Sequence, residues 1–163
     1  MKQLIHYIIS KCDCKKNVGT TVLCKLLYFS DFNHYEIYEK SITDNTYFRY
    51  PQGPYFPDIK DLTEELIAEK KINVSRKFAF LGADYPISSY SPLKSPDLSL
   101  LNSNELKVID SVIDKLSHMN ANEISEYSHG DKPWRVTDEG EELEYEFVFY
   151  RDEKYSVRVY DEE

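Results

Sequence analysis

Apolar residues recur at helical spacing along most of the chain. The first set, within residues 2–11, predicts a short amphipathic helix that ends in a stretch of lysine and asparagine before Gly19. A second set predicts a longer, largely buried helix, which Thr20 or Thr21 can cap and which continues to Tyr38. The apolar positions behind the two helices are Leu4, Ile5, Ile8 and Ile9, and then Leu23, Leu26, Leu27, Tyr28, Phe32, Tyr35 and Tyr38. The first part of the chain is therefore expected to be helical.

Three further helices are indicated by the same spacing and by residues that favour helix starts. Residues 58–71 and residues 103–116 each carry an apolar stripe with a 3.6-residue period, and Ser103 can cap the second of them. Asn120 and Glu123 have the spacing of a capping box, which predicts the start of a short helix.

Alternating apolar and polar residues predict a few short strands. Residues 46–50 alternate before an irregular turn at residues 51–54, and a second strand is expected near residues 78–81, with a proline-containing loop after it. At the carboxy terminus, residues 145–150 and 155–160 also alternate, so a hairpin is expected there, with a helix as the alternative.

These elements predict one α+β domain over residues 1–163. The domain should be predominantly helical, with a small antiparallel β element, because strands are few and no internal repeat or low-complexity linker divides the chain. A chain of 163 residues buries about 70% of its unfolded surface, so a core can form without disulfides.

Composition and charge argue against several classes of protein. No apolar run approaches the roughly 20 residues that span a bilayer, and the first residues do not resemble a signal segment, so we expect no membrane partner and a cytoplasmic location. The net charge of -9 argues against nucleic acid as a partner, because phosphate binding needs clustered lysine and arginine.

The negative charge is concentrated at the carboxy terminus. Residues 138–163 hold 11 acidic and 3 basic side chains, which leaves the rest of the chain nearly neutral. Such a segment can serve solubility alone, or it can steer a basic partner toward the protein.

The three cysteines do not have the spacing of a structural zinc site. A set of His6, Cys12, Cys14 and Cys24 is conceivable, but it lacks the paired C-x-x-C spacing that surrounds a tetrahedral ion. We therefore expect reduced thiols and neither a metal nor another cofactor, with Cys24 as a small core residue.

One acid and two histidines are the candidates for catalysis. Asp31 and His34 are three residues apart on the second predicted helix, and His129 could join them from a turn. The stronger interpretation is structural, since buried polar groups usually satisfy one another and the nearby backbone. The chain carries no nucleophile elbow, phosphate loop or dinucleotide motif, so no catalytic residue is assigned.

Tyrosine is abundant, with 14 in the chain, and this residue is enriched at protein interfaces. Tyr47, Tyr50 and Tyr55 surround the turn at Gly53-Pro54, where glycine and proline set the backbone path. We expect these three tyrosines to be candidate partner contacts, whereas others pack inside.

The single tryptophan is expected to act through structure. Trp134 follows a proline and lies just past a helix that is too short to be stable alone, so its ring should dock that segment against the second helix. His129 can then hydrogen-bond exposed carbonyls or Asp31.

Several runs in a fixed order resemble the SocA-like Panacea domain. They are Lys25 to His34, Ser41 to Thr43, Asp44 to Tyr47, Gly53-Pro54, and Ile124 to His129 with Trp134, over about residues 20–138. The residues that match the family motif are Tyr28, Asp31, His34, Gly53, Pro54, Ser128, His129 and Trp134.

The resemblance implies an antitoxin that neutralises a protein toxin by direct contact, the toxin being encoded by a neighbouring gene. One branch of the family implies a different mechanism, a proteolytic adaptor that delivers the toxin to a protease. A binding protein and an enzyme that uses Asp31, His34 and His129 to undo the toxin's product are therefore the two classes to separate.

Overall fold

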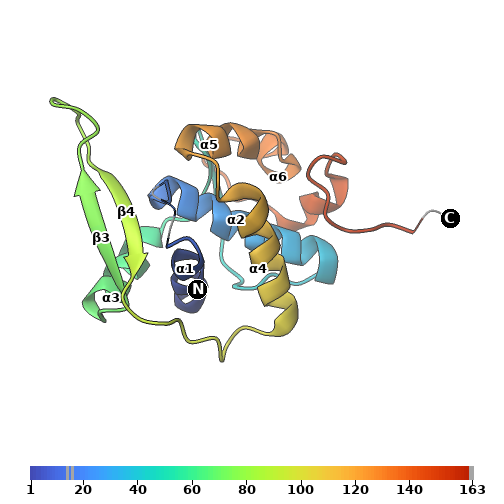
Figure 1. The fold of residues 1–163 in the computed structure, drawn as a ribbon. Helices are drawn as coiled ribbons and strands as arrows, with labels where there is room; N and C mark the ends of the chain where they lie inside the picture. The colour runs from blue at the N-terminus through green and yellow to red at the C-terminus, as the bar shows by residue number, and fades with distance from the viewer. Residues whose placement is uncertain (14, 16, 162–163) are drawn as a thin grey trace.

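The computed structural model describes residues 1–13, 15 and 17–161 of the chain (Figure 1). Its helices are α1 (Lys2–Lys11), α2 (Thr20–Tyr38), α3 (Ile59–Ala68), α4 (Ser103–Leu116), α5 (Ala121–His129) and α6 (Lys132–Val136), followed by the 3₁₀ helix η1 (Tyr145–Tyr150). The strands form two separate antiparallel hairpins, β1 (Phe48–Tyr50) with β2 (Gly53–Tyr55) and β3 (Ile72–Lys77) with β4 (Ile87–Pro92). The predicted α+β class with a helical majority is confirmed.

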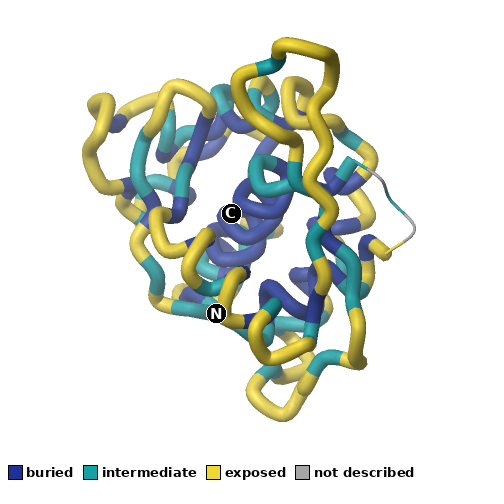
Figure 2. The backbone as a smooth tube through the Cα atoms, turned by 90° about the vertical axis from the view of Figure 1, so that its left-hand side faces the viewer, coloured by how far each residue is buried: buried dark blue, intermediate teal, exposed yellow. Residues whose placement is uncertain are grey.

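Helix α2 runs through the centre of the molecule, and the other elements pack around it. It contacts α1, α4, α5, β2 and η1, and it is dark blue along most of its length in Figure 2. A helix that is apolar on all sides has to be surrounded to exclude water, and α2 is apolar almost continuously from Val22 to Phe29. The prediction of a largely buried second helix is confirmed.

The start of α2 differs from the prediction that a threonine caps it. Gly19 is the N-cap residue, and it makes no side-chain cap hydrogen bond. A Cβ atom at this position would lie 2.4 Å from the Ser88 carbonyl oxygen of β4, so only glycine allows the two backbones to approach. Thr20 and Thr21 are instead the first residues of the helix.

Asparagine side chains cap the two helices that follow. Asn102, rather than Ser103, is the N-cap of α4, where it forms a complete capping box with Glu105. Asn120 caps α5 as expected, because its side chain accepts a hydrogen bond of 2.9 Å from the Glu123 backbone nitrogen.

The strand predicted near Phe78 to Leu81 is wrong, because those residues lie in the turn between β3 and β4. Away from their base the strands are exposed on both faces and, apart from Ile87 at the start of β4, mostly polar, which hides their alternation in the sequence. Only the base of the hairpin, at Ile72 and Tyr90, is buried in the core. The rest projects on the left of Figure 1, and the projecting tip is yellow in Figure 2.

The carboxy-terminal hairpin is also wrong. Residues 145–150 form η1, in which Tyr145 and Val148 face the core with the three-residue period of a 3₁₀ helix. The remaining segment follows without a strand to Asp161, the last residue described, and buries Arg151 and Tyr155. The helical alternative holds for η1, and the segment after it packs as irregular chain.

Among the described residues, no helix is both long enough and apolar enough to cross a membrane.

Candidate functional site

Asp31 is the centre of a buried hydrogen-bond cluster at the middle of α2. Its Oδ1 atom accepts hydrogen bonds of 2.9 Å from the backbone nitrogens of Ile42 and Thr43. Its Oδ2 atom accepts from the hydroxyls of Thr43 and Tyr47. Burial raises the pKa of this carboxyl, and the four hydrogen bonds oppose the shift. Asp31 therefore fixes the chain after α2 against the helix.

The two histidines of the predicted trio are held elsewhere. His34 Nδ1 forms a hydrogen bond with the Lys40 carbonyl oxygen, and its ring lies 4.7 Å from the Tyr38 ring. His129 stacks on Trp134. Within the described residues, Asp31 forms no hydrogen bond with either histidine. The structure does not bring the trio together through side-chain contacts.

Trp134 docks against β1 rather than against α2, which corrects the prediction for this residue. Its ring stacks on His129 with 4.3 Å between centroids, and the Arg49 guanidinium lies 4.0 Å from the ring centroid. The indole nitrogen donates a hydrogen bond of 3.1 Å to the Tyr50 carbonyl oxygen. His129 therefore supports Trp134 and does not bind Asp31.

A buried ionic network, which the sequence did not reveal, joins α2 to the carboxy-terminal segment. Arg151 pairs with Asp131 at 2.7 Å and with Glu36 at 2.9 Å, and it donates a further hydrogen bond to Asn33. Tyr28 donates to the same Asp131 carboxylate at 2.8 Å. Burial lowers the pKa of Arg151, but Asp131 more than restores it, so the guanidinium stays charged. Nothing in residue spacing indicates a pairing across more than 100 residues.

The Gly53-Pro54 turn requires a glycine for two reasons, its backbone angle and the lack of space for a side chain. Gly53 has a φ of 107°, and a Cβ atom there would lie 2.3 Å from Ser128 Oγ and 2.6 Å from Lys25 Cε. The Pro54 carbonyl oxygen accepts a hydrogen bond of 3.0 Å from Lys25 Nζ. Three motif residues, Gly53, Pro54 and Ser128, therefore meet around the Lys25 side chain.

Lys25 is a buried lysine whose amine has no counter-ion among the residues that the structure describes. The residue is 2% exposed, and no carboxylate among the described residues lies within 4.0 Å of its amine. Burial removes water from the amine and thereby lowers its pKa. The neighbouring Cys24 thiol, whose pKa burial raises, accepts a hydrogen bond from the Phe56 backbone nitrogen. A lysine within an apolar run on a helix expected to be buried was the signal that sequence reasoning could have used.

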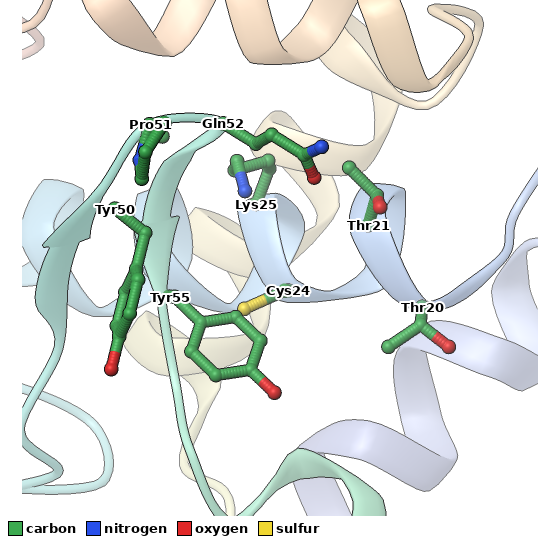
Figure 3. A pocket seen from close by; sticks show the side chains of 9 residues that line it. Thr20, Thr21, Cys24, Lys25, Tyr50, Pro51, Gln52 and Tyr55 are labelled. Carbon is green, nitrogen blue, oxygen red and sulfur yellow. The ribbon is translucent and has the colours of Figure 1, made fainter.

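A pocket of about 310 Å³ opens beside Lys25 (Figure 3). Thr20, Thr21, Cys24 and Lys25 line it from α2, and Tyr50, Pro51, Gln52, Gly53 and Tyr55 line it from the β1–β2 hairpin. The Tyr50 and Tyr55 rings meet edge to face, 5.2 Å apart. Two of the three predicted partner contacts therefore line this pocket. Tyr47 leaves that set, because it is 0% exposed and its hydroxyl binds Asp31.

A second pocket, of about 430 Å³, adjoins the first across the start of α2. The two pockets share Thr20 and Thr21. The far wall of the second comes from Pro86, Ile87 and Ser88 at the start of β4 and from Asn120 and Ala121 at the start of α5. We refer to the two pockets together as the α2 groove.

The conceivable zinc set cannot be assembled from the described residues. Cys14 lies outside them, and no group of three or more histidine, cysteine, aspartate or glutamate side chains that could hold a metal is found within them. Cys12 and Cys24 are buried free thiols, and burial raises the pKa of Cys12 to about 11.

A comparison with protein families finds the model for the antitoxin SocA-like, Panacea domain, which matches residues 23–135. The chain belongs to this family. The match extends from the first turns of α2 to α6 and includes Lys25, Asp31 and the Gly53 turn, whereas Arg151 lies beyond it. No curated protein and no solved structure showed significant similarity to the chain.

Proposed function

We propose that this protein is an antitoxin that neutralises a protein toxin by binding it directly in the cytoplasm. The family supports the antitoxin role, and the proposal takes the toxin to be the product of a neighbouring gene. The observation that supports direct binding is that the motif residue Asp31 is fully engaged inside the fold, whereas aromatic side chains are left at the surface. Asp31 uses both carboxylate oxygens to hold the fold, while Tyr50 and Tyr55 remain at the surface beside the pocket.

Binding explains this arrangement better than catalysis by the predicted trio. A general base needs a carboxylate or imidazole within reach of a substrate proton. Asp31 is enclosed by four donors, and His34 is engaged with the backbone that follows α2. Replacement of Asp31 or His34 should therefore lower the stability of the protein. Neutralisation of the toxin should fall only as far as the amount of folded protein falls.

Co-expression with the neighbouring gene product tests the proposal. We expect the antitoxin to restore growth, to co-purify with the toxin, and to reach full rescue only near equal amounts of the two proteins. Leu100→Asp, at a side chain that is 70% exposed on the loop before α4, is the matched control and should behave as wild type.

Rescue by small amounts of antitoxin without a detectable complex would overturn sequestration. If toxin levels then fell and recovered when cellular proteases were inactivated, the protein would be an adaptor. If the toxin persisted and His34→Gln abolished rescue without lowering the melting temperature, it would be an enzyme.

A further inference from the structure

Lys25 carries a charge that the described part of the fold leaves uncompensated. An ammonium group has three N–H donors, yet the Pro54 carbonyl is the hydrogen-bond acceptor that Nζ finds among the described residues. Buried charges are normally paired, because removing an ion from water is costly. Although Lys25 is only 2% exposed, its side chain lines a pocket that is partly open to solvent, so a carboxylate that enters the pocket comes close to the amine.

Each of the two pockets of the α2 groove is lined in part by apolar or aromatic side chains. Tyr50 and Tyr55 line one end of the α2 groove, and Ile87, which is 60% exposed, lines the other. The turn between β3 and β4 carries further exposed apolar side chains, at Phe78, Phe80, Leu81 and Tyr85. Several exposed large apolar side chains on one element are typical of a surface that a protein partner covers.

We infer that the α2 groove binds a segment of the toxin that places a carboxylate against Lys25 Nζ and apolar side chains between Tyr55 and Ile87. This inference rests on the proposed function and assigns it a surface. The carboxylate belongs to an acidic side chain or to a chain terminus. A fully desolvated charge pair with apolar neighbours has the composition of a binding hot spot.

Two substitutions test the two ends of the groove against the toxin. Lys25→Met keeps the length of the side chain and removes the charge, and Ile87→Asp places a charge on an exposed apolar site. We expect each substitution to raise the dissociation constant of the complex by about tenfold or more, because truncation of a hot-spot residue has effects of this size. Leu100→Asp makes the same kind of change away from the groove and should bind like wild type.

Coupling with a carbodiimide, which adds no spacer, can identify the toxin carboxylate that contacts Lys25 in the wild-type complex. The reagent joins an amine and a carboxylate that touch, so the Lys25 peptide should become linked to an aspartate, a glutamate or the terminus of the toxin. Mass spectrometry of the linked peptides tells these sources apart. The free protein should not give the product, because no described carboxylate lies within 4.0 Å of this amine.

The outcomes separate the groove from the proposed function. If wild type does not bind the toxin, the proposed function fails. If wild type binds and both groove variants bind equally well, or Lys25 is not coupled in the complex, the groove is wrong and the antitoxin role stands. Should Lys25→Met not fold, Ile87→Asp and the coupling product decide.

Discussion

At the scale of single residues, Lys25 is expected to destabilise the free protein. Because burial lowers its pKa below 10.5, the unfolded chain binds more protons than the folded chain between the two pKa values. The wild type should therefore become more stable as pH rises through that interval. Lys25→Met should be more stable than wild type by about 1 kcal/mol near neutral pH, and the difference should vanish above the unfolded value.

Urea unfolding of both proteins from near neutral pH to about 10.5 measures this difference. Lys40→Met is the control, because it makes the same substitution at an exposed lysine on the loop after α2. A Lys25→Met protein that is less stable than wild type at every pH would show that the amine supports the fold. Higher stability together with weaker toxin binding would identify a residue retained for recognition.

At the scale of elements, two glycines in hairpin turns allow the cost of backbone strain to be measured apart from the cost of a steric clash. Gly53→Ala should cost about 2–4 kcal/mol, because an alanine there meets both a positive φ and the side chains of Lys25 and Ser128. Gly82→Ala, in the β3–β4 turn, has a φ of 93° and open space around it, so it should cost about 1 kcal/mol. Chemical denaturation of the two variants measures both, and equal costs would mean that the close approach is relieved by movement of Lys25.

The same scale shows which elements the sequence could predict. Helices whose apolar residues follow a 3.6 period, such as α1 and α4, were predicted within a few residues. The β3–β4 hairpin was misplaced because its outer residues face solvent on both sides and carry no alternation. The motif residues Gly53, Pro54 and Ser128 do meet, but at Lys25, and their meeting point depends on tertiary contacts rather than on spacing.

At the scale of the whole molecule, the carboxy-terminal segment belongs to the core, although the family match ends before it. Its acidic composition is compatible with solubility alone or with steering of a basic partner, yet Leu143, Val148, Arg151 and Tyr155 are buried. Arg151 pairs with both Glu36 and Asp131, whose side chains are fully enclosed with it. Removal of the segment therefore exposes apolar surface and leaves two buried carboxylates unpaired.

Arg151→Met should consequently destabilise the protein by about 3–5 kcal/mol, the cost of leaving a buried charge without its partner. Arg158→Met, which removes an arginine paired with Glu39 nearer the surface, should cost less than about 1 kcal/mol. Thermal and urea unfolding give both values.

Truncation before Gly140 should reduce toxin binding to the same extent at low and high salt, because the fold is lost. A loss confined to low salt would instead show that the segment acts by long-range steering, since salt screens charges beyond about 10 Å at 0.1 M.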